Sequence, residues 1–295
     1  MKKLLIFLIL VLPLTCSLCA CSSDEEDDDE ETVVIYEDGT TSNKSVFLLI
    51  DDDNFYLDYV KYSINFNGNL MVTGYSEWRA RGIANIAPKI SFKGHTYNVT
   101  YIAGEAFKNC EGLTSVTIPP TIREIGEKAF QNCTGLTSLY IPRSVNLIGY
   151  LAFDYCSNLK RISVEEGNEK YYSPDNCNAI IEKGRKNLIQ GCESTIIPDD
   201  VFWIFHESFH GCKNMTSITI PQNVSYIGQN AFKGCSRLTS IHCQMKESVL
   251  AISQCIPNAF DEEQYSSATL YIPKGSREAY MNKSPWKQFK NIVEE

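Results

Sequence analysis

From about residue 90 onward, apolar residues recur at fixed places in a short repeated unit. Each unit begins with one apolar residue, a second follows three positions later, and a third comes two positions after that. The last two alternate with polar residues, a period of two that is typical of a strand with one buried face. The three apolar columns are Leu113, Leu136, Leu159, Met215 and Leu238; Val116, Leu139, Ile162, Ile218 and Ile241; and Ile118, Ile141, Val164, Ile220 and Cys243.

A second phrase, Ala-Phe-x-x-Cys or Ser-Phe-x-x-Cys, keeps the same frame, and its phenylalanines Phe107, Phe130 and Phe153 lie 23 residues apart. Ile-Gly precedes the phrase and Ile-Pro follows the strand in several units. The proline ends the strand, because it has no amide proton to donate to a ladder. A unit this short cannot bury its apolar residues alone, so successive units must stack. The sequence therefore predicts a solenoid.

These motifs resemble the BspA-like branch of leucine-rich repeats, over roughly residues 90–273. The resemblance implies an α/β, mostly β fold: a curved, right-handed leucine-rich-repeat solenoid with 23-residue coils and a parallel sheet on its inner face. Relatives of this kind are associated with adhesion. The resemblance therefore also implies a non-enzymatic binding role toward a host matrix protein, a glycan or another bacterial surface component.

The ends of the solenoid are expected to be capped. Residues 33–89 contain short apolar strings and a hairpin signal, Asn67-Gly68, between alternating arms at 64–72, so we expect N-terminal strands and a β cap there. Residues 274–295 contain Ser276 and Ser284-Pro285, which are typical helix starts. A short C-terminal helical cap follows, in which Tyr280, Trp286 and Phe289 cover the last coil.

Two coils depart from the period. From Leu159 to Cys192, which occupies the next first column, there are 33 residues, a normal coil plus ten. Gly184-Arg185 lies between two apolar arms and suits a type II′ turn, so the extra residues are expected to leave the solenoid as a hairpin. Its tip would present three cations to an anionic partner, unless it is only a solvated turn: Lys183, Arg185 and Lys186. The coil from Leu238 is also stretched and is a second expected protrusion.

The first 20 residues have the pattern of a secretory signal peptide. Two lysines precede an apolar run at 4–14, which is shorter than the roughly 20 residues that a membrane span needs. Leu18-Cys19-Ala20-Cys21 resembles the lipobox of bacterial lipoproteins, which implies lipidation of Cys21 and a membrane anchor. The alternative is an ordinary signal peptide followed by a coincidental cysteine.

The next segment, 21–32, contains eight consecutive acidic residues at 24–31. Adjacent like charges cannot pack, so the segment is predicted to be a solvated tether. Ser22-Ser23 before the acidic run resembles the surface-export signal of lipoproteins in gut-dwelling Gram-negative anaerobes, which implies a lipid-anchored protein of the outer membrane, displayed on the cell surface. A plain tether is the alternative. The net charge of −9 argues against nucleic-acid binding, which needs clustered basic residues.

The chain has 12 cysteines, and five of them occupy one repeat column: Cys110, Cys133, Cys156, Cys212 and Cys235. Zinc binding is one hypothesis, but one cysteine per coil lacks the paired spacing of zinc sites, and a small buried apolar side chain is the favoured interpretation. Cys177 and Cys192 lie opposite each other in a hairpin centred on Gly184-Arg185. A disulfide between them is predicted.

The segment from His206 through Glu207 to His210 matches the zinc-protease pattern His-Glu-x-x-His. That chemistry needs a helix, so that both histidines fall on one face with the glutamate beside the metal-bound water. The repeat frame instead assigns Phe209 to the core, so coincidence is the favoured interpretation. A zinc-dependent hydrolase using His206, Glu207 and His210 is retained as the alternative function. We expect no cofactor and no metal.

The outward positions of the predicted strands carry mostly small hydroxyl residues, which offer no general base. Phosphate-binding glycine loops and serine-nucleophile motifs are absent from the sequence. The larger outward side chains could anchor a partner, or they could be ordinary exposed strand residues. These candidate contacts are Tyr140, Arg161, His242 and Tyr271.

Overall fold

The structure is a computed structural model and describes residues 32–34, 41, 47–51, 53–65, 67–75 and 82–295. The chain divides into two compact units, Met1–Glu30 and Glu31–Glu295, and every element below belongs to the second. The predicted signal peptide, the lipidation site Cys21 and the acidic run at 24–31 lie outside the described residues.

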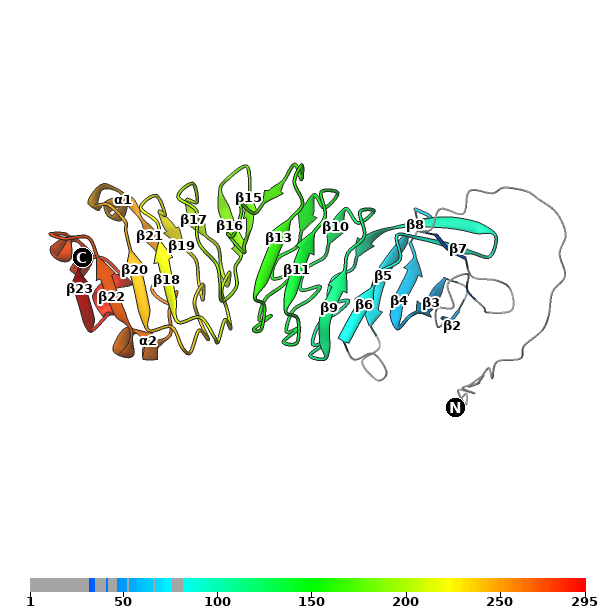
Figure 1. The fold of residues 1–295 in the computed structure, drawn as a ribbon, viewed down its shortest axis with the longest axis horizontal. Helices are drawn as coiled ribbons and strands as arrows, with labels where there is room; N and C mark the ends of the chain where they lie inside the picture. The colour runs from blue at the N-terminus through cyan, green and yellow to red at the C-terminus, as the bar shows by residue number, and fades with distance from the viewer. Residues whose placement is uncertain (1–31, 35–40, 42–46, 52, 66, 76–81) are drawn as a thin grey trace. The chain divides into compact units, whose positions relative to one another are not determined.

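The repeat phrase before Ile-Pro forms a first set of parallel strands, which follow one another in chain order in Figure 1. Ser138 pairs with Arg161 and Ile218 with Ile241, so paired residues are one repeat apart. Buried and exposed residues alternate along these strands, as the sequence predicted. The set comprises β9 (Leu113–Thr117), β11 (Ser138–Ile141), β13 (Arg161–Val164), β18 (Ser217–Ile220), β20 (Ser240–Cys243), β22 (Thr269–Ile272) and β23 (Asn291–Glu294).

A second set of short parallel strands precedes the repeat glycine in each coil: β10 (Glu124–Ile125), β12 (Leu147–Ile148), β17 (Trp203–Ile204), β19 (Tyr226–Ile227) and β21 (Gln254–Cys255). The glycine is needed because neighbouring coils approach closely at this point. A Cβ on Gly149 would lie 2.4 Å from the backbone nitrogen of Glu127 in the preceding coil. A side chain there would therefore separate the coils.

The repeat phenylalanines form the centre of the core. Phe107 stacks on Phe130 at 4.7 Å and Phe130 on Phe153 at 5.4 Å, measured between ring centroids. A second stack joins Phe209 and Phe232 at 5.0 Å and continues to Phe260 at 4.9 Å. Phe260 belongs to a copy of the phrase, Ala259-Phe260, that the sequence analysis missed because it lacks the cysteine.

The cysteine column is buried, and its thiols are free. They are also hydrogen-bond donors: the Cys133 Sγ donates to the Phe107 carbonyl at 3.0 Å, and the Cys235 Sγ donates to the Phe209 carbonyl at 3.1 Å. The column therefore joins successive coils as well as filling the core. The one group of metal-ligating side chains found among the described residues contains no cysteine.

The strands before the repeats form a meander that is continuous with the coils. β2 (Phe47–Leu49), β3 (Asn54–Leu57), β4 (Val60–Ile64) and β5 (Leu70–Tyr75) pair antiparallel in order. The hairpin expected at 64–72 is present, and its loop is closed by a 2.9 Å bond from the Asn65 N–H to the Asn69 carbonyl. β5 then pairs parallel with β8 (His95–Ile102), which pairs with β10. The remaining strands are β1 (Thr32–Val34), β6 (Gly82–Asn85) and β7 (Lys89–Phe92).

Short helices lie in and after the last coils: α1 (Glu247–Ile252), α2 (Glu262–Ser267), α3 (Arg277–Met281) and the 3-10 helix η1 (Trp286–Gln288). Trp286 and Phe289 are buried against Phe260, with ring centroids 6.0 and 5.4 Å away. The chain then adds β23, a strand that the sequence analysis did not anticipate. None of the described helices has the length and apolar character to cross a membrane.

The long coil between Leu159 and Cys192 does not leave the stack as expected. It contains β14 (Tyr171–Tyr172), β15 (Ile180–Glu182) and β16 (Asn187–Gln190), and β16 pairs parallel with β17. Ile181 and Leu188 are fully buried, so the hairpin is built into the core. The turn prediction was also wrong. Gly184 does not have the positive φ that a type II′ turn requires, and the left-handed residue is Lys186, at φ 57°.

The predicted disulfide between Cys177 and Cys192 is not formed, because both are buried free thiols. The arms pair only from Ile180 to Gln190, and a bulge between Ile180 and Ile181 shifts the register by one residue. The cysteines therefore lie beyond the paired segment and out of register with each other. Burial raises the pKa of the Cys177 thiol to about 12, so it stays protonated near neutral pH.

Candidate functional site

The coil that ends at Ile197-Pro198 lacks the turn that carries the repeat phenylalanine. Gly191 takes that place: its N–H donates to the Ser208 carbonyl at 2.8 Å, as the Phe130 N–H donates to the Ala152 carbonyl at 2.7 Å. The aromatic stack is consequently interrupted between Phe153 and Phe209. The buried apolar residues also fall into two clusters that divide within this coil.

Because that turn is missing, the turns of the two flanking coils meet directly. Tyr155 contacts His210 edge-on, with ring centroids 5.0 Å apart, and the Lys213 ammonium lies 5.5 Å from the Tyr155 ring. Phe205 stands where other coils carry the repeat glycine. A large side chain is tolerated at that position, because the neighbouring coil does not place a turn against it.

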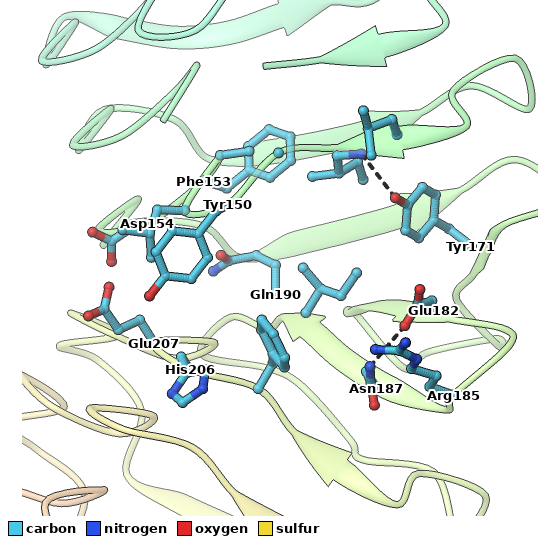
Figure 2. Close-up of a pocket in the computed structure, with 17 residues that line it drawn as sticks. Tyr150, Phe153, Asp154, Tyr171, Glu182, Arg185, Asn187, Gln190, His206 and Glu207 are labelled. Carbon is cyan, nitrogen blue, oxygen red and sulfur yellow. Dashed lines mark hydrogen bonds between the residues drawn. The ribbon is translucent and has the colours of Figure 1, made fainter. Parts of the chain in front are cut away.

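A cavity of about 340 Å³ lies at this interruption. Figure 2 shows Tyr150, Asp154 and Glu207 on one side of it, and Arg185 and Asn187 on the other. Phe153, Ile189 and Phe205 contribute apolar walls. Burial raises the pKa of the Tyr150 hydroxyl, and the carboxylates of Glu207 and Asp154 raise it further. The cavity therefore has an acidic side.

The His-Glu-x-x-His segment does not form a zinc-protease site. It lies in a turn rather than a helix, and Glu207 has a φ of 59°. The His206 Nδ1 accepts from the Gln229 N–H at 2.9 Å, and its Nε2 lies 3.2 Å from the Tyr226 hydroxyl. The two histidines therefore have different partners, and the arrangement required for the alternative zinc hydrolase is absent from this segment.

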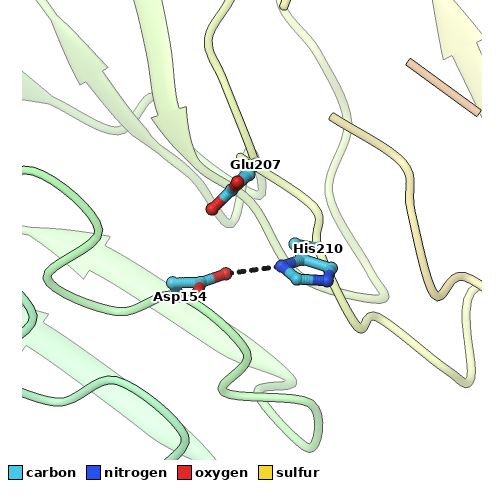
Figure 3. Close-up of side chains that lie close together, drawn as sticks. All are labelled: Asp154, Glu207 and His210. Carbon is cyan, nitrogen blue, oxygen red and sulfur yellow. Dashed lines mark hydrogen bonds and ion pairs between the residues drawn. The ribbon is translucent and has the colours of Figure 1, made fainter. Parts of the chain in front are cut away.

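Asp154 joins Glu207 and His210 in place of His206. Figure 3 shows this group, in which one donor atom from each residue lies within 4.8 Å of the others. The His210 Nδ1 is 2.8 Å from the Asp154 Oδ1. Sequence reasoning missed Asp154 because it is 56 residues from His210 along the chain. The available signal was the repeat itself, since Asp154 follows Phe153 as His210 follows Phe209.

The predicted partner contacts on the strands fall into two places. Tyr140 on β11 is 49% exposed, and Arg161 is exposed on the neighbouring β13. His242 on β20 and Tyr271 on β22 stack at 4.4 Å with an interplanar angle of 6°. The His242 Nδ1 also lies 2.9 Å from the Glu295 Oε1. The two pairs belong to different sheets, so they are separate candidate surfaces.

The three cations of the hairpin do not form a free cluster, which corrects the sequence prediction. The Lys183 Nζ donates to the Asn168 carbonyl at 2.6 Å. The Lys186 Nζ lies 2.9 Å from the Asp200 Oδ2 and 4.5 Å from the Tyr172 ring centroid. The third cation, Arg185, lines the cavity. Because the hairpin is packed into the coil, each cation has partners of its own.

Comparison with known proteins assigns the repeats. The profile of the BspA type leucine rich repeat region matches residues 88–183 and 185–278 in six copies. No curated protein matches. Among solved structures, a leucine rich cell surface protein from Faecalibacterium prausnitzii is 19% identical, with 83% of this chain and 95% of that chain covered and a TM-score of 0.36. The leucine rich repeat protein of T. pallidum is 18% identical, with 72% and 84% covered and a TM-score of 0.37.

The profile match covers more than half of the chain, over the coils whose strands, phenylalanine stacks and cysteine column are described above. The resemblance drawn from the repeat motifs is thereby confirmed. The mostly-β fold with few helices agrees with this assignment. The chain belongs to the family of BspA-type leucine-rich repeat proteins.

Proposed function

We propose that this chain is a non-enzymatic, surface-anchored binding protein that recognises a macromolecule through the outward face of its first strand set. One observation carries the proposal. Thr219, His242, Tyr271 and Val293 pair in succession across β18, β20, β22 and β23, so their side chains form one row. A rigid row on a repeated scaffold suits a large partner better than a small substrate.

The row is preorganised at its centre. The stacked rings of His242 and Tyr271 restrict each other, and the Glu295 carboxylate fixes the imidazole from one side. Val293, 44% exposed, extends the apolar part of the row. Aromatic side chains held in place lose little conformational entropy on binding, which is why they often dominate interface energies.

The proposal includes the geometry of the solenoid. Its coils are 23 residues long and wind right-handed, since crossovers between parallel strands have that hand in nearly all proteins. The strands before the repeats and the helices after residue 273 act as caps that cover the two ends of the core.

The location and partner follow from sequence features and from the family. The lipobox and the acidic run support a lipid anchor at Cys21 and display on the surface of the outer membrane. The partner class is a host matrix protein, a glycan or another bacterial surface component. The absence of catalysis is supported by the separated histidines of the His-Glu-x-x-His segment.

A binding screen with a matched control tests the proposal. Purified protein is offered to immobilised matrix proteins, mucin glycans and bacterial surface extracts. The double variant His242→Ala, Tyr271→Ala should then bind the identified partner at least about tenfold more weakly, as expected for an aromatic hot spot. Trp203→Ala, which removes an exposed aromatic from the second strand set, should bind normally. Equal loss in both variants, or no loss in either, would show that this row is not the binding surface.

Surface display is tested separately. Replacing residues 24–31 by alanine should reduce protease accessibility of the protein on intact cells, while total membrane-bound protein stays constant. If accessibility is unchanged, the acidic run is only a tether.

A further inference from the structure

The strongest unassigned feature of the structure is the group formed by Asp154, Glu207 and His210. These side chains come from two turns that are not consecutive in the repeat and that meet because the intervening coil lacks its own turn. Asp154 adjoins the first phenylalanine stack through Phe153, and the other two flank Phe209 of the second stack. The group therefore bridges the two halves of the core.

The donor atoms are arranged as ligands usually are. One oxygen of Asp154, one of Glu207 and one nitrogen of His210 lie within 4.8 Å of one another. The Asp154 side chain is 7% exposed and that of His210 is 20% exposed. Two carboxylates thus share one imidazole in a partly buried place, where like charges repel unless a cation lies between them.

Outer partners orient the carboxylates. The Gln131 Nε2 donates to the Asp154 Oδ2 at 2.9 Å, and the Asn230 Nδ2 donates to the Glu207 Oε1 at 3.3 Å. Hydrogen bonds of this kind are common around metal ligands, since they fix the direction of the coordinating oxygens.

The neighbouring cavity provides access from outside. Asp154 and Glu207 both line it, so coordination positions not taken by protein atoms would face its interior. Asn187 lines the same cavity and is 4% exposed, and its side-chain oxygen has no hydrogen-bond partner among the described residues. This buried acceptor independently indicates that the cavity takes a polar occupant.

We propose that Asp154, Glu207 and His210 form a binding site for a divalent transition-metal cation such as Zn²⁺. A set of two carboxylates and one imidazole matches the ligands that such cations accept, whereas Ca²⁺ prefers oxygen donors alone. The cation would connect the two halves of the core across the shortened coil. The site is independent of the binding face proposed above.

The test uses the full chain after EDTA treatment and dialysis, titrated with Co²⁺ and Zn²⁺. Wild-type protein should bind one cation per chain, and the Co²⁺ spectrum should lack the charge-transfer band of a thiolate ligand, which excludes the cysteines. Zn²⁺ should also raise the melting temperature, because a ligand that binds only the folded state stabilises it.

Glu207→Gln should weaken the affinity at least about tenfold, since even the loss of an outer partner costs about 10–100-fold. Glu105→Gln is the matched control: Glu105 holds the equivalent repeat position, pairs with Lys108 and lies away from the group, so its affinity should equal that of wild type. Asp154→Asn is a second loss variant if Glu207→Gln melts early without metal. The proposal is overturned by the absence of stoichiometric binding, by equal affinity in wild type and both loss variants, by a thiolate band, or by a preference for Ca²⁺.

Discussion

Gly191→Ala tests how the shortened coil fits into the stack. A Cβ at this position would lie 2.1 Å from the Phe209 Cε1 and 2.7 Å from its Cδ1 and Cζ. Carbon atoms in contact are normally about 3.5–4.0 Å apart, so the ring would have to move by more than about 1 Å. Phe209 is fully buried and stacked on Phe232 at 5.0 Å with an interplanar angle of 9°, which leaves the ring little room.

Overpacking of this kind typically costs about 1–3 kcal/mol. Restriction of the unfolded chain by alanine offsets about 0.4–1 kcal/mol of that. We therefore expect a net loss of about 1–2 kcal/mol in the free energy of unfolding. At roughly 2–4 °C per kcal/mol for a domain of this size, the melting temperature should fall by about 2–6 °C, measured by circular dichroism or calorimetry.

The control is Gly112→Ala, because a Cβ there meets nothing within 4 Å and the backbone φ is not positive. That variant should be neutral or slightly stabilised. A double-mutant cycle with Phe209→Leu isolates the contact: the penalty of Gly191→Ala should shrink once the ring is removed. If Gly191→Ala is as stable as Gly112→Ala, or if its penalty is the same without the ring, the packing described for this coil is wrong.

Phe130→Ala should cost about 3–5 kcal/mol in chemical denaturation, and more than Phe153→Ala, because Phe130 stacks on two rings and Phe153 lies at the end of its stack. Equal costs would contradict the interruption. The Arg143 N–H donates to Glu165 at 2.9 Å and, with the guanidinium, lowers the pKa of that carboxyl. Its stabilising effect is therefore complete above the unfolded pKa near 4.5 and is lost as pH falls through the lower folded value. The melting-temperature difference between wild type and Glu165→Gln should accordingly be present at pH 7 and vanish in acid; a difference that persists in acid would contradict this. Cys21→Ser should move the protein out of the membrane fraction, and retention there would contradict lipidation.

The sequence alone determined the repeated architecture. The columns beginning at Leu113 and Phe107 alternate or recur with a period that only stacked coils can bury, so the strands and the stacked phenylalanines followed from local pattern. The hairpin at 64–72 was equally local, because Asn and Gly favour a tight turn whatever the surroundings. The Ile-Gly motif was visible as a pattern, but its reason, the close approach of two coils at Gly149, needed the coordinates.

Only the tertiary structure decided what the irregular coil does. Its extra residues could have left the stack or entered it, and the burial of Ile181 and Leu188 settled that they entered. A one-residue bulge, which no sequence pattern announced, then displaced Cys177 from Cys192. The group of Asp154, Glu207 and His210 depends on a turn that is missing between them, so no spacing along the chain could have placed the three together. Contacts between turns that are not consecutive in the repeat arise only when a coil between them is shortened, and that is a property of the whole stack.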